Sequence, residues 1–545
     1  MRRRVPVLIV GGGPVGLALA GELGWRGIAC ELVEQGDGTI VSPKMNEVNA
    51  RSMEICRRWG IAERVFNCPF PADYPLDVAF VTNLFGYELS RLERPGRLSR
   101  QPTPESPHRM QACSQIWFDP ILKTFAQSFP TVRLRHRCRL DGFEEHNAGV
   151  AAHLVDLTSG ARETLEADYL VGCDGAASLV RRTLGIELAG QGTIGHPINL
   201  FFRAPGLIER CGKRSATFYL CIDESGLWGN LRVIDPDNGL WRLMVDSTDG
   251  TATPETVDRD RYLNRALGRP LAVEWVDVNI WRRRSALASR YGRGRVWLAG
   301  DAVHQLSPTG GMGMNTGIAD AVDIGWKLAA VLEGWGGAAL LDSYDSERRP
   351  VGARAVRMAT HFYKNSENFP QGSPRLAEDS AEGARLRARI GQELLRAIGP
   401  EFRTIGLQLG YRYEGSPICV PDGTPEPPDD PAEYTPSARP GARAPHVFLR
   451  DGRSILDLFG RGFVLLRFAG APPAASIERA AHARGVPLAS VAIDEPQAAA
   501  LYERRLVLVR PDGHVAWRAD ALPDDPLALI DRLRGAAQAA SAPAS

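Results

Sequence analysis

The N-terminal stretch MRRRVPVLIVGGGPVGLALAG constrains the fold more than any other part of the chain. Residues 5–10 are a β-branched run typical of a buried parallel strand, and Gly11, Gly13 and Gly16 follow at the spacing G-x-G-x-x-G. The first glycine permits a tight turn, the second lets the backbone approach a pyrophosphate, and the third lets the next helix pack against the strand. This pattern predicts a strand, a phosphate loop and a helix.

The residues after the third glycine complete a βαβ unit. A helix is predicted over Val15 to Gly27, with its N-terminal amides facing the pyrophosphate. A second strand, IACELVE, ends on Glu34, where an acid accepts hydrogen bonds from an adenosine ribose. The arginines and apolar residues also fit a secretory signal peptide. Such a peptide needs neither the second strand nor the acid, so we predict a dinucleotide-binding unit kept in the mature protein.

Composition excludes several classes of partner. At 545 residues, the chain is long enough for about three domains. Lys+Arg 65 against Asp+Glu 64 gives a net charge of +1, which does not favour nucleic acid or an anionic membrane surface. The nine cysteines form no C-x-x-C pair, and glycine or proline interrupts every long apolar stretch, so neither a zinc or dithiol site nor a spanning helix is expected. We predict small-molecule chemistry in the cytoplasm.

Two later motifs suggest which dinucleotide is bound. RVWLAGD reads as a strand ending on Gly300 and Asp301, and the loop SPTGGMGMN precedes apolar residues at helical spacing. Gly311 and Gly313 therefore lie at a second helix N-terminus, whose amides suit the electron-rich edge of a flavin, while Asp301 suits the ribityl hydroxyls. Simple turn chemistry is the alternative for the two glycines. Between the motifs, CDGAASLVR places Asp174 after another strand.

The three motifs, in this order, resemble those of the group A flavoprotein aromatic monooxygenases, the p-hydroxybenzoate hydroxylase superfamily. NARSMEICRRWG and the C-terminal extension make the chain more similar to phenol hydroxylases, chlorophenol monooxygenases and polyketide hydroxylases. The resemblance covers the whole chain. It implies FAD as cofactor, NADPH or NADH as co-substrate, and oxygen transfer from a flavin C4a-hydroperoxide to a phenolic or polycyclic aromatic substrate.

The resemblance also implies cofactor contacts, residue by residue. Contacts to the adenine dinucleotide part of FAD are implied for Gly11, Gly13, Pro14, Val15, Gly16, Glu34 and Arg51. Other contacts to FAD, including its ribityl chain and flavin ring, are implied for Gln115, Asp174, Gly300, Asp301, Pro308, Gly311, Gly313, Met314 and Asn315. Lys44 stands where many relatives have an arginine, and lysine does not reproduce the planar fork of that side chain. No metal ligand is implied.

The fold class implied is α/β with three domains. A discontinuous Rossmann-type FAD-binding domain is predicted over 1–75, 108–195 and 285–365, and an antiparallel β substrate domain over 76–107 and 196–284. A helical segment (366–416) and a proline-rich linker (417–445) lead to a thioredoxin-like domain (446–535) and a disordered tail (536–545). The last domain lacks C-x-x-C, so we expect it to serve packing or a homodimer rather than disulfide exchange.

Other assignments stay open. A Baeyer–Villiger oxygenase on the same scaffold would attack a ketone with a deprotonated hydroperoxide, and a flavin-binding protein without oxygen chemistry is a third class. The catalytic base is unassigned, because structural roles are favoured for the polar residues Tyr219, His196 and Asn46. The arginines of WRRRS (281–285) suit either a nicotinamide dinucleotide phosphate or a solvated surface.

Overall fold

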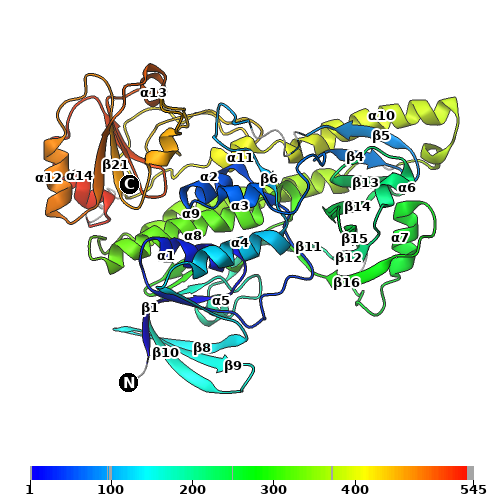
Figure 1. The fold of residues 1–545 in the computed structure, drawn as a ribbon, viewed down its shortest axis with the longest axis horizontal. Helices are drawn as coiled ribbons and strands as arrows, with labels where there is room; N and C mark the ends of the chain where they lie inside the picture. Colours follow the sequence, from blue (N-terminus) through cyan, green and yellow to red (C-terminus); the bar gives the residue numbers. More distant parts are fainter. Residues whose placement is uncertain (1–2, 95, 97–100, 248–249, 370–371, 537–545) are drawn as a thin grey trace, which may run out of the picture.

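The computed structural model describes residues 3–94, 96, 101–247, 250–369 and 372–536 (Figure 1). Its largest sheet contains the N-terminal strand β1 (Arg4–Val10), paired in parallel with β10 (Arg162–Gly172) on one side and β2 (Cys30–Val33) on the other. Outside these lie β19 (Val296–Leu298), β18 (Gly292–Arg293) and β7 (Val132–Arg135). The strands β8 (Cys138–His146) and β9 (Gly149–Asp156) extend the sheet as an antiparallel arm at the bottom of Figure 1. The N-terminal segment, for which a signal peptide was the alternative interpretation, thus contains a central strand of the fold.

Helices α1 (Pro14–Trp25), α4 (Gln115–Gln127) and α8 (Gly313–Leu332) pack together against this sheet. Close packing explains the third glycine of the motif, since a Cβ on Gly16 would lie 1.9 Å from the carbonyl oxygen of Gly11. Helix α1 ends two residues before its predicted end because Gly27 takes a positive φ of 83°. Helix α1 begins just after the carboxyl end of β1. Helix α8 follows β19 after a longer loop.

The second sheet has the strand order β16-β12-β15-β14-β13-β4-β5 and is antiparallel except for the pair β13 and β4. Its strands are β4 (Val78–Val81), β5 (Glu88–Leu92), β12 (Pro197–Arg203), β13 (Phe218–Asp223), β14 (Gly226–Asp235), β15 (Leu240–Asp246) and β16 (Glu274–Ile280). All of them lie within the segments predicted for the substrate domain. Helix α7 (Arg259–Leu267) packs into the apolar core on one face, while α10 (Ala381–Ile398) contacts β5 at the sheet edge. Polar side chains of β12, β14, β15 and β16 are left facing a cavity.

A third, four-stranded sheet follows residues 417–445. It contains β21 (Phe463–Arg467), β22 (Leu488–Ala492), β23 (Leu506–Val509) and β24 (Val515–Ala519), with helices α12 (Ala475–Ala483), α13 (Pro496–Tyr502) and α14 (Pro526–Leu533). Helix α13 is not foreseen by the sequence pattern. Residues 417–445, predicted as a linker, form no regular helix or strand in the structure, but they are held in place, for instance by Arg443 against Glu54.

The other helices and strands connect these sheets. They are β3 (Glu47–Val48), α2 (Ala50–Arg58), α3 (Ala62–Phe66), β6 (Gln111–Ala112), α5 (Leu179–Thr183), β11 (Leu188–Gly195), α6 (Leu207–Cys211), β17 (Arg283–Ala288), β20 (His304–Gln305), α9 (Asp342–Glu367) and α11 (Ile405–Leu409). Within the described ranges, every helix is too short or too polar to cross a lipid bilayer. Apart from Ala536, the predicted tail lies outside the described residues.

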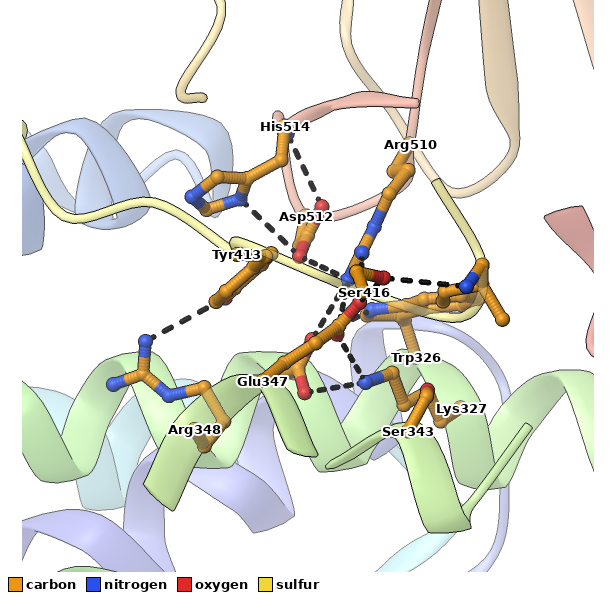
Figure 2. A network of polar contacts seen from close by, with 12 residues as sticks. Trp326, Lys327, Ser343, Glu347, Arg348, Tyr413, Ser416, Arg510, Asp512 and His514 are labelled. Atoms are coloured by element: carbon orange, nitrogen blue, oxygen red, sulfur yellow. Dashed lines mark hydrogen bonds and ion pairs between the residues drawn. The ribbon is translucent and has the colours of Figure 1, made fainter. Parts of the chain in front are cut away.

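A fully buried ion cluster joins the C-terminal sheet to helices α8 and α9 (Figure 2). Arg510, which follows β23, donates to Asp323 at 3.1 Å and to Glu347 at 2.9 Å. Lys327 donates to the same two acids at 2.7 and 2.6 Å. The cluster fixes the C-terminal sheet against the helix that begins at the predicted flavin loop.

Candidate active site

A cavity of about 1380 Å³ lies where the first two sheets meet. Of the predicted cofactor residues, ten line it: Gly13, Pro14, Val15, Gln115, Asp301, Pro308, Gly311, Gly313, Met314 and Asn315. The structure thus brings the phosphate loop, the GD turn and the glycine loop of α8 to one space, although up to about 300 residues separate them in the sequence.

The two helix ends at the cavity fit an elongated dinucleotide. Neither α1 nor α8 has a side-chain cap among the described residues, so first-turn amides of both helices remain available to a ligand. A Cβ built on Gly13 would meet no described atom within 4 Å, which leaves a cradle for a phosphate at the start of α1. The cavity therefore offers one anion site at the start of α1 and a second amide-lined site at the start of α8.

Five predicted residues lie beside the cavity lining without being part of it. Gly11 has a φ of 109°, and a Cβ there would lie 2.4 Å from the carbonyl oxygen of Cys173. The Glu34 carboxylate accepts hydrogen bonds from the amides of Gly12 (2.7 Å) and Gly36 (2.6 Å), and each oxygen keeps a lone pair for a ribose hydroxyl. The remaining residues are Gly16, Asp174 and Gly300.

Hydrogen bonds hold Asp174 and the turn at Gly300 and Asp301 in place. One oxygen of Asp174 accepts from the Val180 amide at 3.1 Å, while the other is buried without a partner in the part of the chain that the structure describes. Asp320, on α8, accepts from the Gly300 amide (3.2 Å) and from His304 (2.9 Å). Burial alone would raise the pKa of Asp320, but Arg348 and His304 hold it below its ordinary value.

Arg51 does not reach the cavity. Its guanidinium donates to Tyr411 (3.3 Å), Glu54 (3.0 Å) and the carbonyl oxygen of Asp512 (2.7 Å). These contacts use all three nitrogens and aim the side chain at the C-terminal sheet. The predicted phosphate contact is therefore not supported by this geometry, and α2 contributes its N-terminal residues Asn49 and Ala50 to the cavity instead.

Gln115 and Lys44 lie together at the wall. The side-chain oxygen of Gln115 accepts from the Lys44 amide at 2.9 Å, and its nitrogen donates to Asp119 at 2.9 Å. Burial raises the pKa of Asp119 to about 7. Gln115 therefore holds the segment containing Lys44 in position, and Lys44 lines the cavity.

Arginines gather on the cavity face of the second sheet. Arg232 on β14 stands directly opposite Arg242 on β15, and like charges in this arrangement repel. Glu47 accepts from Arg232 at 3.1 Å and also pairs with Arg94. Arg242 has no acidic partner among the described side chains, and burial, followed by the charges of Arg232 and Arg283, lowers its pKa to about 9. An anionic ligand bound between Arg232 and Arg242 would reduce the repulsion between their charges.

Of the polar residues that the sequence analysis considered, some line the cavity and others lie away from it. Asn46, Arg282 and Arg284 line the cavity, whereas Tyr219 and His196 do not. Tyr219 is in the apolar core beneath α7 and donates to the carbonyl oxygen of Arg214 at 3.2 Å.

Sequence reasoning missed the arginines on β14 and β15 and a cavity acid, Glu401. The alternation in WGNLRVID and WRLMVDS carried a signal for the strands, because residues two apart share one face. No motif marked Glu401.

The fold and cavity together define an FAD-binding flavoprotein. A family model described as an FAD binding domain matches residues 4–359, and one described as the C-terminal part of aromatic-ring hydroxylases matches residues 437–540. FAD-dependent monooxygenase apdD of Emericella nidulans is 35% identical over 558 residues, covering 95% of this chain and 88% of that protein.

Two solved structures extend the comparison. RebC soaked with chromopyrrolic acid and with bound 7-carboxy-K252c has a TM-score of 0.92 at 41% identity, covering 98% of this chain and all of that one (100%). Aklavinone-11 hydroxylase with FAD and aklavinone has a TM-score of 0.81 at 30% identity, covering 98% and 100%.

The chain belongs to the FAD-dependent aromatic hydroxylases, the family that its motifs resemble. It is an FAD-dependent monooxygenase that hydroxylates aromatic rings with NAD(P)H and O2. The predicted fold class, cofactor and enzyme class are confirmed, and the relatives give no support to the Baeyer–Villiger or non-catalytic alternatives.

Proposed function

We propose that this monooxygenase hydroxylates a planar polycyclic aromatic compound that carries a carboxylate. The observation that carries the proposal is the pair Arg232 and Arg242, which face each other in the cavity while only Arg232 has an acidic partner. A carboxylate between the two guanidinium groups would accept charge-assisted hydrogen bonds and remove their repulsion. The nine cysteines, all thiols in the structure, suit a reducing cytoplasm as the site of this reaction.

The cavity size and a relative support the same substrate class. FAD and an extended ring system both require room, and the cavity offers about 1380 Å³. The structure of RebC contains 7-carboxy-K252c after soaking with chromopyrrolic acid, and its chain is 41% identical to this one. Phe218, over which Arg232 lies at 4.1 Å, adds an aromatic surface beside the arginine pair.

The protein's own part in the reaction is to bind, orient and exclude water. FAD, when bound, supplies the activation of O2 with electrons from NAD(P)H. The residues that would hold it are the amides at the starts of α1 and α8, with Glu34, Asp174 and Asp301 as acceptors for its hydroxyl groups. The arginine pair anchors one end of the substrate, so that a ring edge points toward the loop containing Pro308.

The test compares a planar polycyclic aromatic carboxylic acid with its methyl ester. We expect the acid to bind more tightly and to accelerate NAD(P)H oxidation, and Arg242→Gln to weaken its binding by about 10- to 100-fold while leaving the ester unaffected. Arg203→Gln is the matched control, because Arg203 is in the same sheet but outside the cavity, near Glu274. Equal binding of acid and ester, or unchanged discrimination in Arg242→Gln, would contradict the proposal.

A further inference from the structure

Glu401 is placed between the predicted flavin loop and the substrate sheet. It follows α10 in the short helix η4 (Gly399–Phe402) and lines the cavity. The short helix η2 (Thr309–Gly311) contacts η4 and places the backbone of Gly310 near the Glu401 carboxylate. The next residue, Phe402, packs on Phe218 of β13 with ring centroids 5.6 Å apart. A side chain at this position borders both the loop that carries Pro308 and the sheet that carries the arginine pair.

Glu401 differs from Glu47, another acid of the cavity. Glu47 is held as an anion by Arg94 and Arg232, which keep its pKa low although burial alone would raise it. For Glu401, no ion pair with lysine or arginine is found in the described chain. The charged groups facing it are Arg283 of β17, Glu47 of β3, Arg94, and Arg232 of β14, which also pairs with Glu47. Burial, with the Glu47 charge adding to it, raises the pKa of Glu401 to about 7, so both protonation forms are populated at neutral pH.

We propose that Glu401 is the catalytic base of the hydroxylation, removing the proton from an O–H or N–H group on the aromatic substrate. The bond to hydrogen breaks, its electron pair stays on the substrate heteroatom, and the proton forms an O–H bond with a carboxylate oxygen of Glu401. The added electron density activates the ring carbon that receives oxygen. Glu401 then releases the proton to water, while NAD(P)H and O2 supply all of the redox change. This inference rests on the hydroxylase function and on the placement of substrate in this cavity.

The first measurement is the pH profile of kcat/KM for the wild-type enzyme and for Glu401→Gln. Because the base must be ionised, kcat/KM of the wild type should rise with pH through an apparent pKa near 7. In Glu401→Gln this rise should disappear and kcat/KM should fall by about 100-fold or more. Glu401→Asp should restore part of the rise. Glu382→Gln, an exposed site on α10, should keep the wild-type profile.

A second measurement separates a base from a residue that only supports the loop. The dissociation constant of FAD, measured by flavin fluorescence, and the rate of flavin reduction by NAD(P)H should stay within about threefold of wild type in Glu401→Gln, with hydrogen peroxide replacing hydroxylated product. A larger loss of FAD affinity would assign Glu401 to holding Gly310 and overturn the proposal. So would a wild-type profile without an ionisation between pH 6 and 8, or a variant with an unchanged profile. If the wild type itself hydroxylates no aromatic carboxylic acid, the proposed substrate class fails instead.

Discussion

At the scale of single residues, Gly13 and Gly16 belong to one motif but are glycine for different reasons: Gly13 borders the open cavity, and Gly16 packs against protein backbone. Gly13 has extended backbone angles that any residue adopts, and a Cβ there would meet only open cavity. A Cβ on Gly16 would collide with the carbonyl oxygen of Gly11 at 1.9 Å. We therefore expect Gly13 to be needed by the ligand, whereas Gly16 is needed by the fold.

We predict that Gly13→Ala leaves the FAD-free protein as stable as wild type, within about 0.5 kcal/mol, because nothing in the protein contacts the new methyl group. Its FAD dissociation constant should rise by about 10- to 100-fold, since the methyl group separates the pyrophosphate from the amides. Gly16→Ala should instead destabilise the FAD-free protein by about 1–3 kcal/mol. Urea unfolding of FAD-free protein and fluorescence titration with FAD measure the two effects. Equal FAD affinities for Gly13→Ala and wild type would show that the phosphate lies elsewhere.

This contrast explains what could be predicted from the sequence. The meeting of the glycine loops at one cavity was predictable, because a backbone that closely approaches a ligand leaves few choices of residue type. The direction of the Arg51 side chain was not, because it depends on Tyr411 and Asp512, which lie more than 350 residues away in the chain. Glu401 was equally hidden, since its environment is made by Gly310, Arg283 and Glu47 from three other elements.

At the scale of elements, the turn between β23 and β24 connects the C-terminal sheet to three helices. Arg510 reaches α8 and α9, while the carbonyl oxygens of Pro511 and Asp512 accept hydrogen bonds from Arg58 and Arg51 of α2. The ion cluster that anchors this turn could not be predicted from local sequence patterns. Its charges come from helices more than 160 residues away (Figure 2).

We predict that Arg510→Met destabilises the protein by about 3–5 kcal/mol, because Asp323 and Glu347 would share Lys327 as their cation in a site closed to water. Arg505→Met, nearby at the start of β23, removes a half-exposed ion pair with Asp520 and should cost less than about 1 kcal/mol. The free energy of unfolding from urea titrations checks both values. Similar losses for the two variants would mean that the buried cluster contributes little to joining the sheet and the helices.

At the scale of the whole molecule, the same joint carries a buried histidine that makes stability depend on pH. The His514 ring packs on Tyr413 with centroids 4.2 Å apart and on Tyr411 at 5.3 Å. Burial, opposed by Asp512, lowers the pKa of His514 to about 4. Between pH 6.5 and 4 the unfolded chain therefore binds more protons at this residue than the folded protein does, and the folded state loses stability as pH falls.

We predict that the free energy of unfolding of the wild type falls by about 2.5 kcal/mol relative to His514→Gln when the pH is lowered from 7.5 to 4.5, since glutamine does not titrate. The comparison with a variant is needed because Asp119 and Glu401, whose pKa values are raised to about 7, bind protons in the folded state and act in the opposite direction. Urea unfolding followed by tryptophan fluorescence at several pH values gives the difference. His482→Gln, at an exposed position of α12, should run parallel to the wild type. If the free energy of unfolding of His514→Gln fell with pH as much as that of the wild type, protonation of His514 would not be the cause of the loss of stability in acid.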